Sequence, residues 1–182
     1  DIRASAFLSC ESLLNITLPS SLVSIGESAF AGCTSLASIM IPNSVKTIGE
    51  GAFANCRSLT SVSLPSSLRE IGEGAFAGCQ ELAFYTADDN LSALSEEMFR
   101  DCVSLREVVI PAAVTVIPRS AFSGCISLRE VNIPANVQSI GEGAFFNTVK
   151  LNSVSIPASV KTIGPAAFYN SGIQTLTLQE GL

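Results

Sequence analysis

The chain contains no histidine, and this absence removes the side chain that most often serves as a general base or a metal ligand. It also removes the Ser-His and Cys-His pairs that activate nucleophiles. No uninterrupted apolar stretch approaches the ~20 residues that a membrane helix needs. Lys and Arg are few and scattered, and the net charge is −6, which disfavours nucleic acid as a partner. We therefore expect no membrane span and no nucleic-acid binding.

The remaining candidates for chemistry are weak. Strings such as Gly72-Glu73-Gly74 resemble a phosphate loop, but they recur as repeat turns and lack the lysine of a P-loop. Asp88-Asp89 offers carboxylates without an identifiable partner, and no dense oxygen cluster suggests a calcium site. We predict no catalytic residue, no cofactor and no metal, and we interpret the chain as a non-enzyme.

What the sequence does contain is a repeat of 23 residues. A phenylalanine returns at this period eight times, without insertion, at Phe7, Phe30, Phe53, Phe76, Phe99, Phe122, Phe145 and Phe168. One copy reads P-x-S-V-x-x-I-G-E-x-A-F-x-x-C-x-S-L-x-x-V-x-I. A fixed period of this size is typical of a solenoid, in which each repeat is one structural unit that buries its apolar residues against its neighbours.

Each part of the repeat predicts a local structure. The segment L-x-x-V-x-I alternates apolar and polar residues, which indicates a short strand with one buried face. Proline then ends the strand, because it has no N–H to donate. V-x-x-I-G predicts a second short strand before a turn, and the spacing in G-E-x-A-F-x-x-C predicts a short helix or 3₁₀ turn. Stacked copies would form a parallel sheet along one side.

The pattern L-x-x-V-x-I-P-x-S-V-x-x-I-G-E-x-A-F-x-x-C resembles the BspA-like, or treponemal-type, leucine-rich repeat from end to end. The resemblance implies an α/β leucine-rich-repeat solenoid, right-handed and curved, of about eight 23-residue repeats. It also implies surface-exposed or secreted proteins of host-associated microbes, which act as adhesins or interaction modules. We therefore expect a cell-surface or secreted location.

The organisation is that of one domain. All 182 residues share the repeat, and 47% of them are apolar, which is rich in core material. The chain starts and stops in mid-repeat, and neither end carries the polar cap that a solenoid needs for solubility. We interpret residues 1–182 as a single leucine-rich-repeat domain within a longer protein, whose caps and export signal lie elsewhere.

The six cysteines also follow the period, at Cys10, Cys33, Cys56, Cys79, Cys102 and Cys125. Zinc sites need converging ligands, which one thiol per repeat does not provide. Neighbouring copies could come within the ~4.4–6.8 Å Cα separation of a disulfide. However, stacked side chains point the same way, and Thr148 and Ser171 continue the column, so free buried thiols are the better interpretation.

An acidic column recurs at Glu27, Glu50, Glu73, Glu96 and Glu142. One interpretation is a stripe that binds a divalent cation or a basic partner. The interpretation that we favour is a solvated turn, in which each carboxylate complements the start of a short helix. No residue of this column is therefore assigned to a site.

The fourth repeat departs from the others. Tyr85 and Ala87 replace two aliphatic residues, an exchange that could conserve core volume. Asp88-Asp89-Asn90 replaces the Pro-x-Ser turn, so the repeat is either a specialised site or a degenerate copy. In the next two repeats, Arg106-Glu107 and Arg129-Glu130 could pair diagonally in an ion lattice of small energetic value.

The two residues that flank the Val of each L-x-x-V-x-I segment point away from the core, and we call the surface that they form the strand face. Most of its positions hold small hydroxylated residues, whereas Met40, Phe84 and Val109 are large and apolar. Exposed apolar groups on a polar face often mark contacts, although single ones are common on protein surfaces. The predicted partner-binding residues are Met40, Phe84, Thr86, Glu107, Val109, Glu130 and Asn132.

These observations favour a non-enzymatic interaction module, part of an adhesin that binds host or microbial proteins, or a glycan, through the strand face. The alternative is a structural stalk, or a repeat segment that assembles into homo-oligomers. An exchange of Phe84 for alanine separates the two, because only the first role depends on the exposed ring.

Overall fold

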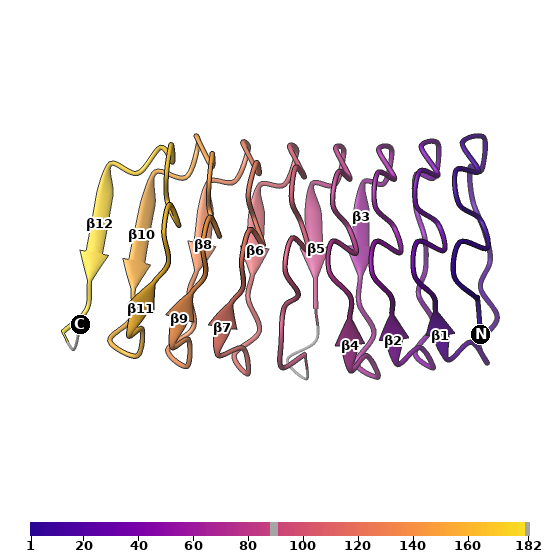
Figure 1. Cartoon of the computed structure of the whole chain (residues 1–182), viewed down its shortest axis with the longest axis horizontal. Coiled ribbons are helices and arrows are strands. Elements are labelled where there is room, and N and C mark those ends of the chain that lie inside the picture. Colours follow the sequence, from indigo (N-terminus) through magenta and orange to yellow (C-terminus); the bar gives the residue numbers. More distant parts are fainter. Residues whose placement is uncertain (88–90, 181–182) are drawn as a thin grey trace.

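The computed structural model, which describes residues 1–87 and 91–180, is a parallel β-solenoid of about seven turns (Figure 1). Residues 1 and 180, the first and last that are described, lie at opposite ends of the stack. The sequence predicts eight repeats, which is one more than the turns found.

The L-x-x-V-x-I segments form one row of parallel strands, as predicted (Figure 1). The row pairs β3 with β5, β6 with β8, and β10 with β12. In β3, β5 and β6 the central residue is buried and its two neighbours are exposed, whereas all four residues of β12, at the end of the stack, are exposed. In the first two copies the equivalent residues 15–17 and 38–40 form no strand, contrary to the prediction. The strands of this row are β3 (Ser61–Ser63), β5 (Phe84–Thr86), β6 (Glu107–Val109), β8 (Glu130–Asn132), β10 (Ser153–Ile156) and β12 (Thr175–Leu178).

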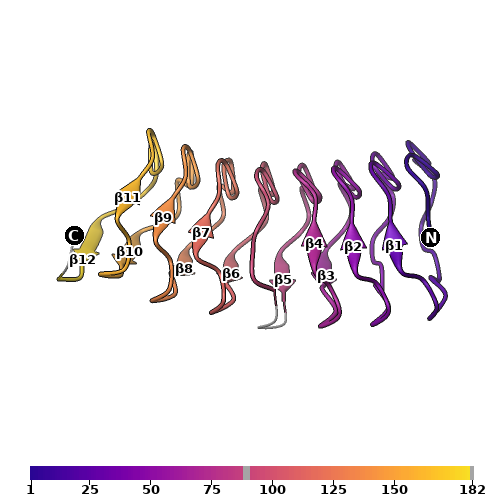
Figure 2. The same cartoon turned by 60° about the horizontal axis from the view of Figure 1, so that its bottom comes forward.

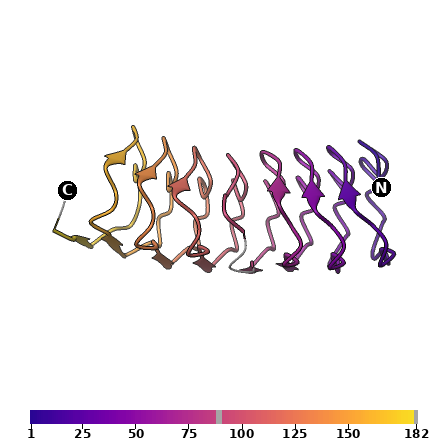
Figure 3. The same cartoon turned by 90° about the horizontal axis from the view of Figure 1, so that it is seen from below.

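The V-x-x-I segments form a second row of two-residue strands, which confirms the second predicted strand (Figures 2 and 3). This row is divided into two sheets, β1-β2-β4 and β7-β9-β11. The turn between them forms no strand over the described residues 91–94. The strands are β1 (Ser24–Ile25), β2 (Thr47–Ile48), β4 (Glu70–Ile71), β7 (Val116–Ile117), β9 (Ser139–Ile140) and β11 (Thr162–Ile163).

The predicted helix is wrong: G-E-x-A-F-x-x-C forms a turn in every copy, and residues 1–87 and 91–180 contain no helix. Two positions per copy have a left-handed backbone, with φ between 51 and 74°, which is incompatible with a right-handed helix. The first position holds Ser5, Ser28, Gly51, Gly74, Glu97, Ser120, Gly143 and Ala166, and the second holds Ser9, Gly32, Asn55, Gly78, Asp101, Gly124, Asn147 and Asn170.

This backbone sends alternate N–H groups to the neighbouring turn. In the second copy, Phe30 N–H donates to the carbonyl of Ala52 at 2.8 Å, one turn along the stack. The next N–H, of Ala31, donates within its own turn to the carbonyl of Ser28 at 3.1 Å. Because the same alternation recurs from copy to copy, each corner of the solenoid is hydrogen-bonded along the stack, as the strands are.

The core contains a column of stacked phenylalanine rings. Neighbouring centroids lie 5.1 to 5.4 Å apart in most of the column. On either side of Phe99 the distance increases to 5.9 Å toward Phe76 and 5.7 Å toward Phe122. The cores of these turns are therefore more widely spaced around the copy that lacks a second-row strand. The corner hydrogen bonds between the same turns keep their usual length, for example 2.7 Å from Gly78 N–H to the carbonyl of Arg100.

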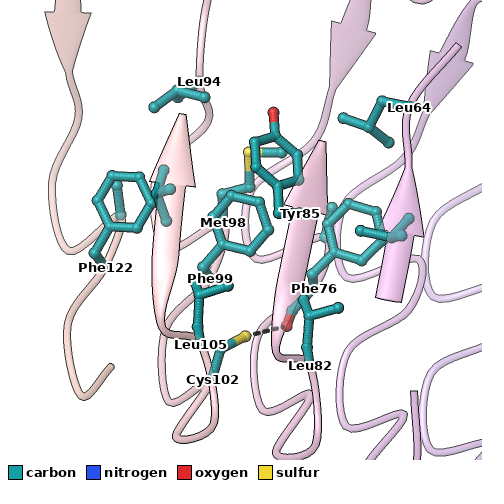
Figure 4. Packing of buried hydrophobic residues seen from close by; sticks show 14 of the residues in the cluster. Leu64, Phe76, Leu82, Tyr85, Leu94, Met98, Phe99, Cys102, Leu105 and Phe122 are labelled. Atoms are coloured by element: carbon teal, nitrogen blue, oxygen red, sulfur yellow. Dashed lines mark hydrogen bonds between the residues drawn. The ribbon is translucent and has the colours of Figure 1, made fainter. Parts of the chain in front are cut away.

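Two large side chains occupy the core at this wider spacing (Figure 4). Tyr85 replaces the usual Val and its ring meets Phe99 edge to face, with centroids 4.6 Å apart. Met98 stands where other copies have alanine and is fully buried. Burial raises the pKa of the Tyr85 hydroxyl, which has no hydrogen-bond partner among the described residues. Tyr85 is a core residue, as predicted. The sequence suggests that Tyr85 alone offsets the small Ala87, whereas the structure shows that Met98 also adds volume to this part of the core.

A glycine before the corner lets neighbouring turns approach closely. At Gly49, an added Cβ would lie 2.5 Å from Glu27 N and 2.7 Å from Gly26 C. These are backbone atoms, and they cannot withdraw without disturbing the 2.8 Å hydrogen bond from Gly49 N–H to the carbonyl of Ile25. The same position holds Ser95 and Pro118 in the widely spaced turns.

We expect Gly49→Ala to lower the free energy of unfolding by about 2 kcal/mol or more, since the new methyl group would force the turns apart. Ser95→Ala is the matched control at the same repeat position. It loses one hydrogen bond, from Ser95 Oγ to the carbonyl of Gly72, at a cost of about 1 kcal/mol. Urea unfolding measures both. Equal losses of unfolding free energy in the two variants would show that the close approach of neighbouring turns is not the reason for glycine at this position.

Candidate protein-interaction surface

The strand face consists of two columns of outward-pointing residues. In register across the strands, Ser61 lies beside Phe84, and Glu107 beside Glu130. The second column includes Thr86, Val109 and Asn132. Within the strand pairs β3-β5, β6-β8 and β10-β12, each residue pairs with the one at the same position in the next copy, and this register orders the columns.

Three adjacent strands, β5, β6 and β8, carry the larger side chains of this face (Figure 1). All of these side chains are exposed; Phe84 has 57% and Val109 has 66% of its surface accessible. The neighbouring strands β3 and β10 carry only serines at the same outward positions. The structure therefore brings six of the seven predicted residues together in one central patch, which consists of Phe84, Thr86, Glu107, Val109, Glu130 and Asn132.

Met40, the seventh predicted residue, lies apart from the central patch. It lies in the second copy, whereas Phe84 lies in the fourth, and 85% of its surface is exposed. It borders two hollows, one of about 570 Å³ over the serines of β3 and one of about 400 Å³ beside Ile16 and Leu18. A third hollow of about 380 Å³ lies over the serines of β10, next to Glu130 and Asn132. The strand face is thus raised at Met40 and at the central patch and is hollow beside both.

The predicted pairing of Arg106-Glu107 with Arg129-Glu130 is not found: the structure records no ion pair for these four side chains within the described part of the chain. The principal ion network lies instead at the corners, around Arg119. Its guanidinium lies 2.8 Å from Glu96, 3.2 Å from Glu97 and 3.5 Å from Glu73.

Arg119 stands in the acidic column, one period after Glu96, a signal that was available in the sequence. The hydrogen bond to Glu96 and the nearby carboxylates raise the pKa of Arg119. In the widely spaced turns the acidic column therefore contains its own cation, Arg119, which neutralises part of the charge of its carboxylates. Arg119, Glu73 and Glu96 are about half exposed, so their ion pairs contribute little to stability. The side chain of Glu97 is more buried. Because residues 1–87 and 91–180 form no helix, the carboxylates do not complement helix starts as the sequence suggests.

All six cysteines are free thiols, and five of them are buried, whereas Cys10 is exposed. Each buried thiol donates a hydrogen bond to the phenylalanine carbonyl of the preceding turn; Cys102 Sγ, for example, lies 3.2 Å from Phe76 O (Figure 4). Burial raises the pKa of Cys56 to about 12 and also raises those of Cys79, Cys102 and Cys125. The buried thiols therefore hold their protons and serve packing.

The described residues contain no group of three or more His, Cys, Asp or Glu side chains that could hold a metal ion. The pair Asp88-Asp89, considered as a source of carboxylates, lies outside these residues. The same part of the chain forms no helix that is long and apolar enough to cross a membrane.

Fold and surface together define a repeat solenoid that presents an extended, accessible strand face. The model of the BspA type leucine rich repeat region matches residues 1–129 and 115–182, so the chain belongs to this family. Leucine-rich-repeat proteins generally bind proteins, and this family consists of non-enzymatic repeat proteins. No curated protein matches the chain.

Solved structures show the same fold. The leucine rich repeat protein of T. pallidum is 35% identical with a TM-score of 0.77, over 82% of this chain and 70% of that one. A leucine rich cell surface protein from Faecalibacterium prausnitzii is 24% identical with a TM-score of 0.52, over 97% and 62%. The pneumococcal vaccine antigen PcpA is 21% identical with a TM-score of 0.62, over 91% and 50%. The chain thus spans half to 70% of these relatives.

Proposed function

We propose that this chain is a non-enzymatic interaction module that binds a protein partner through its strand face, as part of a cell-surface or secreted adhesin. The central patch carries the proposal, because Phe84 and Val109 are exposed where the preceding copies have Ser61 and Thr86 and the following copies have Glu107 and Asn132. Exposed aromatic and aliphatic groups on a polar surface are typical of binding hot spots. The names of two relatives, a cell surface protein and a vaccine antigen, support the location.

The alternative is a structural stalk or a self-assembling segment. The regular hydrogen bonding between turns suits a stalk, but a stalk gains nothing from a bare phenylalanine on the strand face. A glycan is the alternative ligand, and the hydroxyl-rich hollows beside the patch would suit it. The same binding experiment distinguishes these possibilities.

We expect Phe84→Ala to weaken capture of a protein partner by tenfold or more, because a hot-spot side chain at the centre of an interface contributes about 2 kcal/mol or more. The measurement is label-free binding of the folded chain to a panel of host matrix proteins, serum proteins and glycans. Folding of each variant is checked by thermal unfolding.

Tyr169→Ala is the matched control, since this ring is 64% exposed but lies at a corner, stacked on Phe146, away from the strand face. It should leave capture unchanged. Equal losses in both variants would contradict the assignment of the strand face. If the folded chain binds no member of the panel, the stalk becomes the better interpretation; if it binds glycans alone, the partner class is wrong.

A further inference from the structure

We propose that the central patch binds an arginine side chain of its protein partner at Glu107 and Glu130, while an apolar neighbour of that arginine contacts Val109. This inference rests on the proposed function and adds the chemistry of the partner. It follows from four features of the patch: a pair of like charges, the lack of a counter-charge, an adjacent aromatic ring, and the shape of the surface.

Glu107 and Glu130 are direct neighbours in the parallel pair of β6 and β8. Their Cα atoms are therefore about one strand spacing apart, ~4.8 Å, and both side chains are exposed on the same face. Like charges placed directly opposite one another destabilise a sheet. The other copies carry uncharged residues at this position, namely Asn15, Ser38, Ser61, Phe84, Ser153 and Thr175, so the fold does not need the two carboxylates.

No Lys or Arg side chain of the described residues forms an ion pair with these two carboxylates, although Arg106 and Arg129 are the adjacent residues in sequence. The outward positions of the strand face hold no Lys or Arg. Glu107 and Glu130 are therefore the only charges on these positions, and a complementary partner must be positive there.

Phe84 precedes Glu107 in the same column, on the adjacent strand β5 (Figure 1). A guanidinium can stack on an aromatic ring and donate two parallel hydrogen bonds to a carboxylate, whereas an ammonium cannot do both. A divalent cation fits less well, because no third acidic, histidine or cysteine side chain of the described chain joins the pair. The combination of ring and carboxylates selects arginine.

The shape of the face fits a protein segment around that arginine. Val109 lies on the same face of β6 as Glu107 and pairs with Asn132 on β8. An apolar residue next to the arginine of the partner could therefore pack on Val109, and the partner backbone could form hydrogen bonds with the Asn132 amide. The hollow over the serines of β10 borders Glu130 and Asn132 and leaves room for the rest of the segment. A partner surface with arginine next to an apolar residue therefore matches the patch.

The test uses capped peptides with one arginine between two leucines, immobilised at high density so that weak contacts add up. Parallel surfaces carry lysine, or citrulline as an uncharged isostere, in place of the arginine. We expect the binding signal of the folded chain at low salt to be at least tenfold larger on the arginine peptide than on the citrulline peptide. The double variant Glu107→Gln and Glu130→Gln should lose this preference, with an unchanged or slightly higher Tm.

The matched control is the double variant Glu27→Gln and Glu50→Gln, which removes the same charge from two neighbouring exposed carboxylates of the acidic column and should keep the preference. Equal responses to arginine and citrulline, or equal losses in both double variants, would overturn the inference. Equal responses to arginine and lysine would overturn the choice of arginine.

The panel of proteins separates the two proposals. If a panel protein is captured in a manner that Phe84→Ala abolishes and the Glu107→Gln, Glu130→Gln variant does not weaken, the strand face is a binding surface and the arginine inference is wrong. If capture is insensitive to both changes, the proposed function itself fails. Loss in both variants, with the Glu27→Gln, Glu50→Gln control unaffected, supports both proposals.

Discussion

Replacing Phe99 by alanine is expected to lower the free energy of unfolding by about 3 to 5 kcal/mol, the range for deleting a large buried aromatic side chain. Phe99 is fully buried. It stacks between Phe76 and Phe122 and meets Tyr85 edge to face, so its removal takes one face of packing from three rings. Backbone hydrogen bonds between turns prevent the stack from closing over the cavity.

Urea unfolding measures this loss as a shift of the transition midpoint. Phe84→Ala is the control for the loss of a phenylalanine as such; because that ring is half exposed, we expect a change within about 0.5 kcal/mol. A loss below about 1 kcal/mol for Phe99→Ala would show that the widely spaced turns collapse around the cavity, and that the ring column does not hold them in place.

Raising the pH above 9 is expected to destabilise the solenoid steeply. Burial raises the pKa of Cys56 from 9.0 to about 12 and raises those of Cys79, Cys102 and Cys125. Above pH 9 the unfolded chain releases these protons while the folded chain keeps them. The unfolded state then binds fewer protons, so stability falls as pH rises, and the fall ends only at the pKa of the folded state.

Each such thiol costs about 1.4 kcal/mol per pH unit above its ordinary pKa. At pH 10 the four thiols together would remove roughly 5 to 6 kcal/mol, which is comparable with the whole stability of many domains. Below pH 8 the same groups are protonated in both states and contribute no pH dependence. Urea unfolding at pH 7, 8, 9 and 10 gives the curve.

The control is the double variant Cys79→Ala and Cys102→Ala. It is less stable at pH 7, because it loses two thiol hydrogen bonds to carbonyl oxygens and some packing. Its decline between pH 8 and pH 10 should nevertheless be about half that of the natural chain. The same decline in both proteins would mean that other groups cause the alkaline loss.

The apolar columns predict the strands well, because a period of two and a period of 23 residues together determine which side chains point inward. Val62 and Val108 are buried in their strands and Phe84 and Val109 are exposed, as expected. The central patch could therefore be located from the sequence. Its role in binding stays a prediction, since exposure alone does not identify a partner.

The corner could not be predicted as easily. Ala, Phe and Cys occur there at helical spacing, and the interpretation as a helix depended on that spacing alone. The left-handed positions at Gly51 and Gly74 are consistent with glycine, but Ser28 and Glu97 occupy the same conformation. Hydrogen bonds to the next turn impose this left-handed conformation. The sequence of one repeat, taken alone, does not reveal these contacts between turns.

The regular spacing of the phenylalanine column determines where whole repeats can be gained or lost without disturbing the core. Duplicating or deleting one 23-residue unit in the evenly spaced part would again place ring on ring and glycine against backbone, so the product would fold. A second copy of the fourth repeat would bring Tyr85 and Met98 against turns at the narrower spacing. We expect natural variation in repeat number to spare the region around Phe99 and to occur on either side of it.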